Sequence, residues 1–285
     1  MQKIGLVIEG GGFRGIFTAG FLDFFLENEI EFPYVIGVSM GACNGANYIS
    51  KQKKRSIAIP YDFIDDDRYI SFKNLLKDGN LFGMDFIFHE IPYEHNLFDF
   101  KTFKETPQTF LITAMDCISG ETFYFNKEKL SDKEALTALK ASCSLPLISK
   151  MVSLQGRRFL DGGLSDSIPI QKAFEDGMDK VVVLLTRERG YRKKPSKSNF
   201  LLKQMYKKYP KVLEAIETRH VKYNDTLDLI ERLEKEGQVL ALYPEKAIPI
   251  GRTERNKDKL MAAYEAGYQQ ALKMKDQIIR FIERS

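Results

Sequence analysis

Two short apolar runs, each followed by a tight turn and a helical pattern, constrain the fold of this chain most. The run at 4–8 precedes a glycine-rich turn, and the run at 34–38 leads into a turn that contains a serine. Apolar residues at helical spacing then predict helices over 14–28 and 41–50. Strand, turn and helix, twice in succession, indicate an α/β sheet of parallel strands joined by right-handed crossovers.

Later segments extend this pattern. Strand patterns are predicted at 109–115, 122–125, 157–160 and 180–186, the first two as a hairpin, with a helix at 132–140. Further along, helical patterns appear at 198–216, 219–236 and 256–284, with a strand at 238–243. The sequence therefore predicts an α/β domain followed by a mainly helical region.

Composition excludes several classes of protein. A hydrophobic share of 44% over 285 residues supports a sizeable core and excludes disorder. The 43 Lys and Arg against 39 Asp and Glu are too balanced to predict nucleic-acid binding. Three scattered cysteines exclude a disulfide framework and a CxxC zinc site. With no visible signal peptide and no membrane-span-length apolar stretch, we expect a cytoplasmic protein.

The first turn is rich in glycine, with the sequence Gly10-Gly11-Gly12-Phe13-Arg14-Gly15. It matches G-x-G-x-x-G, the dinucleotide-binding pattern, but no Gly-Lys-Ser/Thr follows, which excludes a P-loop. Backbone N–H groups of such a loop can point at an anion beside a helix N-terminus. Three interpretations stay open at this point: a pyrophosphate site, an oxyanion site for acyl transfer, and a tight structural turn.

The second turn has the sequence Gly37-Val38-Ser39-Met40-Gly41. G-x-S-x-G between a strand and a helix is the pattern of a nucleophile elbow, in which glycines let the backbone turn sharply and expose the serine hydroxyl. The dinucleotide hypothesis requires an acid at the tip of the second strand; Ser39 occupies that tip, and Glu31 precedes the strand. The context favours Ser39 as a nucleophile over a structural turn.

A serine needs a base to take its proton. Asp161-Gly162-Gly163 ends a predicted strand, although Asp-Gly is also a common turn dipeptide. The order Ser39, Asp161, His220 matches that of an α/β-hydrolase triad, so a Ser-Asp-His esterase is an alternative. Against it, Ser39 ends only the second predicted strand, and the surroundings of His220 are typical of a polar helix face.

Taken in order, these three motifs resemble those of the patatin-like phospholipases. Two lesser matches support the resemblance: the segment 141–146 (Ala-Ser-Cys-Ser-Leu-Pro) and Pro169 after Asp-Gly-Gly. The resemblance covers residues 4–186, and Glu9 stands where many members have aspartate. It implies a three-layer fold with a mostly parallel central sheet, a catalytic domain over 1–190, and a mainly helical extension over 191–285 packed on it.

The resemblance also implies a chemistry. Ser39 would attack the carbonyl of a lipid ester and Asp161 would act as general base and acid, so that no histidine is needed. The loop residues Gly10, Gly11, Gly12, Arg14 and Gly15 would form the oxyanion hole, with Arg14 mainly holding the loop, and Gly37 and Gly41 would shape the elbow. No cofactor or metal is implied. A non-catalytic lipid-binding regulator and a nucleotide-dependent oxidoreductase are the remaining alternatives.

Two further segments bear on the substrate. Apolar side chains within 51–104 are expected either in the core or in the wall of an acyl-chain pocket: Phe63, Leu75, Leu76, Phe82, Phe86, Ile87 and Phe88. Residues 187–211 hold ten Lys or Arg and one acid. Such a segment is either a solvated charged face or a basic amphipathic helix on the anionic inner membrane surface. Head group, acyl length and oligomeric state are not encoded in these patterns.

Overall fold

The apolar runs predicted as the first two strands are buried along their whole length, because helices cover both faces of their sheet. The computed structural model describes residues 2–197 and 200–283. Five strands pair in parallel, in the order β3-β2-β1-β7-β8. Their bounds are β1 (Ile4–Ile8), β2 (Tyr34–Val38), β3 (Thr109–Asp116), β7 (Lys180–Leu184) and β8 (Val239–Leu242).

Three antiparallel strands complete the eight-stranded sheet on its β3 side. They are β4 (Thr122–Asn126), β5 (Val152–Leu154) and β6 (Arg157–Asp161), of which β4 and β6 both pair with β3. The predicted hairpin at 109–125 is confirmed. Sequence periodicity missed β5, since three residues are too few for a pattern.

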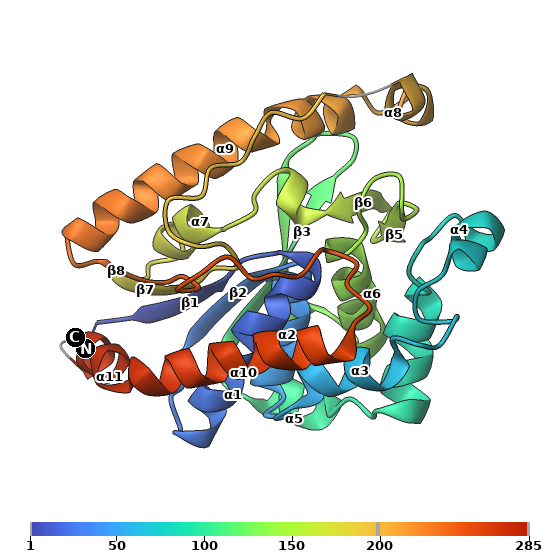
Figure 1. Cartoon of the computed structure of the whole chain (residues 1–285). Helices are drawn as coiled ribbons and strands as arrows, with labels where there is room; N and C mark the ends of the chain where they lie inside the picture. Colours follow the sequence, from blue (N-terminus) through green and yellow to red (C-terminus); the bar gives the residue numbers. More distant parts are fainter. Residues whose placement is uncertain (1, 198–199, 284–285) are drawn as a thin grey trace.

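Helices on the two faces make three layers, as predicted (Figure 1). On one face lie α1 (Ile16–Glu27), α2 (Met40–Ile49) and α6 (Asp132–Ser142), and on the other α7 (Ile170–Glu175) and α9 (Pro210–Lys235). Shorter elements are α5 (Phe100–Glu105), η1 (Gly12–Gly15), η3 (Lys127–Lys129) and η4 (Gly162–Leu164).

The last hundred residues are mainly helical, but the predicted division into helices is partly wrong. In place of helices at 198–216 and 219–236, the structure has the short α8 (Phe200–Met205) and one continuous α9, which begins at Pro210. Proline suits the first turn of a helix, whereas nothing at 217–218 interrupts α9. The predicted helix at 256–284 is divided into α10 (Lys257–Lys273) and α11 (Lys275–Glu283). Positions 198, 199 and 284 lie outside the described residues.

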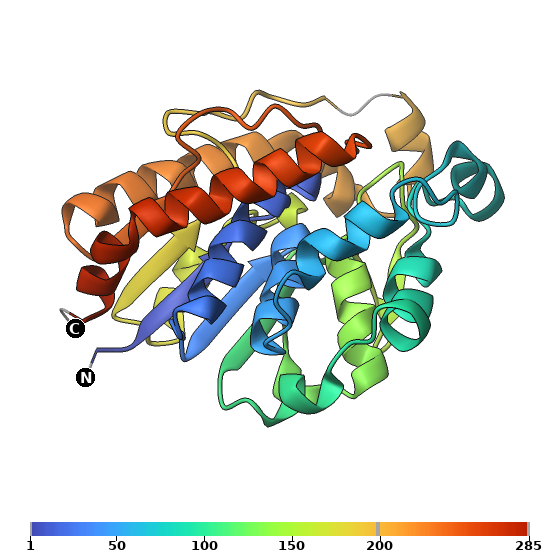
Figure 2. The same cartoon turned by 60° about the horizontal axis from the view of Figure 1, so that its bottom comes forward.

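The C-terminal region is tied into the rest of the fold at two places. Strand β8, near the predicted 238–243, pairs with β7 at the edge of the central sheet. Helix α10 lies along α1, as Figure 2 shows, and covers the face of α1 that carries Asp23. Asp23 is buried there and accepts a hydrogen bond from Tyr264 at 2.8 Å.

Two glycines allow α1 and α10 to approach at backbone distance. A Cβ atom on Gly267 would lie 1.9 Å from the carbonyl oxygen of Phe17, and one on Gly20 would lie 2.3 Å from that of Tyr264. Neither contact leaves room for a methyl group. The crossing therefore requires both glycines, although glycine lowers the intrinsic stability of a helix.

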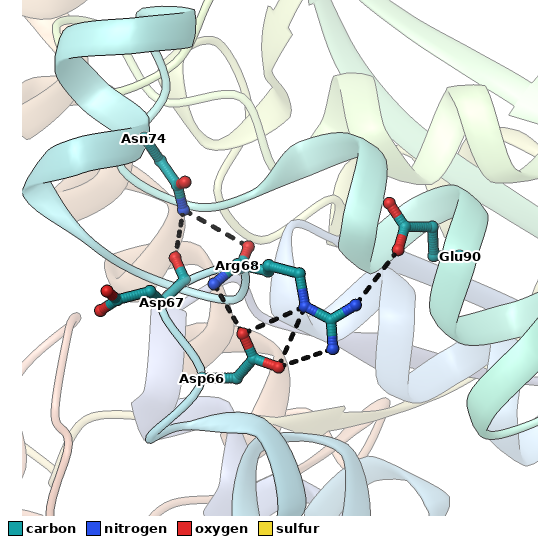
Figure 3. Close-up of polar contacts among 5 residues, drawn as sticks. All are labelled: Asp66, Asp67, Arg68, Asn74 and Glu90. Carbon is teal, nitrogen blue, oxygen red and sulfur yellow. Dashed lines mark hydrogen bonds and ion pairs between the residues drawn. The ribbon is translucent and has the colours of Figure 1, made fainter.

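Residues 55–105 form a helical cap beyond one end of the sheet, made of α3 (Arg55–Phe63), α4 (Phe72–Asp78), the π-helix η2 (Phe86–His95) and α5. Figure 3 shows how its turns are held. Arg68 pairs with Asp66 at 2.8 Å and with Glu90 of η2 at 3.6 Å, while Asn74 of α4 donates to the carbonyl oxygens of Asp67 and Arg68. These contacts connect α3, α4 and η2 into one unit.

The α1–α10 crossing gives a stability prediction. Gly267→Ala is expected to lower the free energy of unfolding by about 2–3 kcal/mol, because the added methyl forces two backbones apart. Ala266→Ser, at an exposed position of the same helix, serves as the control and should change stability by less than about 0.5 kcal/mol. Chemical denaturation measures both. Equal effects of the two substitutions would contradict the close-approach argument.

Candidate active site

Ser39 occupies a sharp turn between β2 and α2, as the G-x-S-x-G pattern predicts. Its backbone angles, φ 54° and ψ −127°, lie outside the regions that a non-glycine residue ordinarily adopts. The flanking glycines make the turn sterically feasible: a Cβ on Gly41 would lie 2.5 Å from the Ile8 carbonyl oxygen, and one on Gly37 equally close to that of Gly41. The turn therefore packs closely against the end of β1.

A buried hydroxyl holds this turn in place. The Oγ atom of Ser142, at the end of α6, accepts a hydrogen bond from the Ser39 N–H at 2.7 Å and donates one to the Thr113 carbonyl oxygen at 2.6 Å. Ser142 belongs to the Ala-Ser-Cys-Ser-Leu-Pro segment, which sequence analysis used only as support for a family resemblance. The structure shows that it connects the elbow to β3.

The sheet register brings Asp161 to the same level as Ser39. Val38 of β2 pairs with Thr113 of β3, and the next residue of β3, Ala114, pairs with Asp161 of β6. Ser39 and Asp161 therefore lie on either side of β3, about 10 Å apart at two strand spacings. Side chains of this size can meet across that span. The structure thus brings together two residues separated by more than a hundred positions.

Asp161 is buried, and only one of its two carboxylate oxygens accepts a hydrogen bond from the described residues. One carboxylate oxygen, Oδ1, accepts from the Gly163 N–H at 2.8 Å, whereas Oδ2 accepts no hydrogen bond within the described residues. Burial raises the pKa of Asp161 above its usual range, while the charge of Arg219 and the nearby Ser39 hydroxyl act in the opposite direction. The hydroxyl thus favours the ionised carboxylate without completing a hydrogen bond, and such contacts often tighten only when substrate binds.

The glycine loop lies beside this pair, and its members differ in their contacts. The N–H groups of Gly11 and Gly12 donate to no acceptor among the described residues, whereas that of Gly10 donates to the Ser167 carbonyl oxygen at 3.5 Å. Gly12 adopts φ 57°, a conformation that favours glycine. Gly15 packs against Met40 and lines neither cavity at Ser39. Among the described residues of the loop, Gly11 and Gly12 therefore have N–H groups left for another acceptor.

Arg14, the charged residue of the loop, is buried, and its Nε atom has no hydrogen-bond partner in the described part of the chain. Burial and the charges of Arg187 and Arg252 lower its pKa to about 10. Glu9, just before the loop, accepts from the Tyr223 hydroxyl at 2.7 Å and from the Thr186 N–H at 2.6 Å. These bonds connect the loop to β7 and α9.

An apolar cavity of about 140 Å³ opens at Ser39 and runs beneath the helical cap. Of the side chains expected in an acyl-chain wall, Phe82, Ile87 and Phe88 line it. Phe63 and Phe86 instead pack edge-to-face against each other, and both rings contact that of His95 at a tilt. The expectation fails for Leu75 and Leu76 of α4, which do not reach the cavity; Leu76 is 88% exposed.

Two cysteines that are far apart in sequence meet in this cavity. The Sγ atoms of Cys43, on α2, and Cys143, at the end of α6, lie 3.5 Å apart as free thiols. The pKa of the Cys143 thiol is raised, first by its contact with Cys43 and then by burial. Their spacing of a hundred residues gave no sequence signal, because only the fold brings the ends of these helices together.

No histidine of this chain lines either cavity at Ser39. The Nδ1 atom of His220 lies 2.9 Å from the carbonyl oxygen of Glu217 within its own helix, and His89 packs against Tyr93. Glu31, the acid that precedes β2, pairs with Lys51 at 2.6 Å. Within the described residues, no cluster of His, Cys, Asp or Glu suited to a metal ion occurs.

A family model described as patatin-like phospholipase matches residues 6–174, which include the glycine loop, the elbow and Asp161. The chain belongs to this family. The resemblance inferred from the motifs is thereby confirmed, as is the α/β fold. A second family model, described as a domain of unknown function (DUF6363), matches residues 209–283, from α9 to α11.

This patatin-like protein is similar to an uncharacterized protein and to two proteins named as lipid hydrolases. It is 27% identical to the uncharacterized protein YjjU of Escherichia coli K12, over 86% of this chain and 70% of the relative. It is 26% identical to the probable lipid hydrolase 463L of Invertebrate iridescent virus 6, over 60% and 63% of the two chains. It is 27% identical to the lysophospholipase NTE1 of Cryptococcus neoformans, covering 64% of this chain but 11% of that protein.

The environment of Asp161 predicts the pH dependence of any reaction for which its carboxylate is the base. Because burial raises its pKa, kcat/KM on a neutral ester should fall with acidification at a pH above the roughly 3.9 of an ordinary aspartate. Arg219→Gln removes a positive charge that favours the ionised form, so the acid limb should move to higher pH.

The matched control is Lys222→Gln, which removes one positive charge from the same helix on an exposed side chain. Its acid limb should coincide with that of the wild-type protein. If both variants shift the profile equally, the effect reflects overall charge, and the assignment to Asp161 is contradicted.

Proposed function

We propose that this protein hydrolyses carboxylic esters of lipids, with Ser39 as nucleophile and Asp161 as general base and acid. The observation that carries the proposal is the arrangement around Ser39, a strained turn at the mouth of an apolar cavity. Next to it lies a buried carboxylate oxygen of Asp161 that has no hydrogen-bond partner among the residues the structure describes. The cavity suits an acyl chain, and the family is that of the patatin-like phospholipases.

The proposed reaction has two halves. Ser39 Oγ attacks the ester carbonyl carbon as its proton passes to Asp161, and the N–H groups of Gly11 and Gly12 stabilise the oxyanion. The bond to the alcohol then breaks, and Asp161 protonates the departing oxygen, which leaves an acyl-Ser39 ester. In the second half, Asp161 takes a proton from water and the hydroxyl attacks the acyl carbon. The bond to Ser39 Oγ then breaks, Asp161 returns the proton to that oxygen, and the fatty acid leaves.

The contacts around Ser39 favour this mechanism over the alternatives. A Ser-Asp-His triad would need His220 beside Asp161, but that histidine lies outside both cavities and contacts its own helix. A nucleotide-dependent oxidoreductase would need an acid at the tip of β2, where Ser39 stands. A lipid-binding regulator would use the same cavity without turnover, so only a kinetic test separates it from the enzyme.

That test uses Ser39→Ala and Asp161→Asn on a panel of chromogenic esters and phospholipids. Each substitution should lower kcat by about a thousandfold or more, because each removes a group required for acyl transfer. A fluorophosphonate probe should label the wild-type protein at Ser39. Folding of both variants is checked by circular dichroism. If either variant folds and retains turnover, the proposed roles of Ser39 and Asp161 are refuted.

His220→Ala is the control that distinguishes the two-residue mechanism from a Ser-Asp-His triad. The two-residue mechanism expects activity within about twofold of wild type, whereas a triad expects a loss of orders of magnitude. Binding of NAD(P) in a direct titration would instead support the oxidoreductase alternative.

We further propose that the protein reaches its substrate at an anionic membrane surface through α8. Phe200, Leu201 and Met205 of this short helix are 81%, 57% and 51% exposed, next to Lys203, Lys207 and Lys208. Exposed apolar side chains among cations are typical of contact with anionic lipid. Within the described residues, no helix has the length and hydropathy of a membrane span, so the contact proposed is peripheral.

Removing this apolar surface should weaken membrane binding. The double variant Phe200→Ser/Leu201→Ser is expected to bind phosphatidylglycerol vesicles at least tenfold more weakly in co-sedimentation, because burial of two large side chains is lost. Val221→Ser, at an apolar position of α9 that is 48% exposed, is the control and should bind as wild type does. Equal binding of the wild type to phosphatidylcholine vesicles would contradict the role of charge.

A further inference from the structure

A second cavity, of about 30 Å³, opens at Ser39 and shares Gly12, Ser39 and Arg252 with the apolar cavity. Apart from these residues and Leu145, which both cavities share, its wall is mainly polar, whereas that of the first is mainly apolar. Five basic side chains line what we call the cationic pocket: Arg14, Arg187, Lys193, Arg219 and Arg252. The ester site thus has an apolar cavity on one side and a strongly basic one on the other.

Most of the basic residues come from outside the segment that matches the patatin-like family. Arg187 and Lys193 follow β7, Arg219 lies on α9, and Arg252 belongs to the connection between β8 and α10. They converge beside the glycine loop, because β7 is the neighbour of β1 on the side away from β2. Loops that leave two adjacent parallel strands in opposite directions open a crevice at the carboxyl ends of the strands, where ligands commonly bind.

The basic side chains of the cationic pocket outnumber the acidic ones, five to two. None of the five basic side chains makes an ion pair within 4.0 Å in the part of the chain that the structure describes. Two carboxylates, Glu9 and Asp161, line the pocket as well. Both oxygens of Glu9 already accept hydrogen bonds from Thr186 and Tyr223.

Two of the basic side chains lie against aromatic rings, which position them without accepting a conventional hydrogen bond from them. Lys193 Nζ lies 4.1 Å from the centre of the Tyr223 ring, and the Arg187 guanidinium lies 4.6 Å from that of Tyr191. Within residues 2–197 and 200–283, neither cationic group donates a hydrogen bond to the protein. Burial, together with the charges of Arg219 and Arg252, lowers the pKa of Lys193 to about 7. A cluster of this kind is stabilised by an anion.

We propose that the cationic pocket binds a phosphate-sized anion on the alcohol part of the ester, so that the preferred substrate is an acyl glycerol phosphate. The inference rests on the proposed function and specifies its substrate class. With the acyl chain in the apolar cavity and the carbonyl at Ser39, the alcohol part points into the cationic pocket, since the two cavities meet there.

Size and charge select the kind of anion. A cavity of about 30 Å³ has room for roughly two or three water-sized groups, which suits a terminal phosphate better than a choline-substituted head group. Four arginines and Lys193, whose protonated form an anion would favour, face two carboxylates, and this balance matches a doubly charged phosphomonoester better than a singly charged diester. Arginine and lysine donors at the rim supply charge-assisted hydrogen bonds to its oxygens.

Turnover of soluble short-chain substrates tests the proposal without a membrane surface. We expect kcat/KM for octanoyl glycerol phosphate to exceed that for uncharged octanoyl glycerol, and for octanoyl glycerophosphocholine, by at least tenfold. Lys193→Gln should lower the ratio of phosphate to uncharged substrate by about tenfold or more, as expected for the loss of one charge-assisted hydrogen bond. Lys194→Gln, an exposed neighbour with the same change of charge, should leave that ratio within twofold of wild type.

Binding to the Ser39→Ala variant separates this inference from the proposed function. Glycerol phosphate and inorganic phosphate are titrated calorimetrically into Ser39→Ala, alone and combined with Lys193→Gln; binding weakened by the second substitution supports the pocket even if no ester is hydrolysed. Ester hydrolysis at Ser39 with neither phosphate binding nor phosphate preference would overturn the inference and leave the proposed function intact. Binding of inorganic phosphate without a substrate preference would overturn the substrate assignment in favour of a free-phosphate site.

Discussion

The strained turn at Ser39 is the constraint on which the rest of the candidate site depends. A serine at positive φ is stable only where its surroundings fix it, and such strain costs on the order of 1–3 kcal/mol. In this protein, contacts with three strands of the sheet fix the conformation of Ser39. Gly41 packs against the end of β1, the Ser142 hydroxyl bonds the turn to β3, and β2 enters the turn from the centre of the sheet. The position of the hydroxyl group therefore follows from the sheet itself.

The C-terminal region contributes to the site rather than merely flanking it. Glu9 joins the glycine loop to Tyr223 of α9 and to Thr186 at the end of β7, and the Arg252 carbonyl oxygen accepts from the Phe13 N–H at 3.4 Å. Glutamate in place of the aspartate common in the family is long enough to make both contacts. The boundary predicted at residue 190 thus separates segments that share one sheet and one pocket.

Burial explains which sequence predictions held. Strands β1, β2 and β7 were predicted because short, continuous apolar runs are typical of the centre of a parallel sheet. Predictions based on amphipathic faces were less accurate. The helix pattern at 14–28 did not indicate that α10 covers α1, where Tyr264 donates a hydrogen bond to the buried Asp23. Leu76 suggested a pocket wall and is exposed, because a hydrophobic side chain does not specify what it packs against.

Local sequence by itself determined the elbow, the glycine loop and Asp161, since tight turns demand glycine and leave short, ordered motifs. The tertiary structure alone decided how these motifs combine with the rest of the chain. The distance between Ser39 and Asp161 follows from the β2-β3-β6 register, and the thiols of Cys43 and Cys143 meet only through helix packing. Likewise, the cationic pocket gathers its basic side chains from four separate segments. Charge interactions depend on distance in space, and a sequence records only distance along the chain.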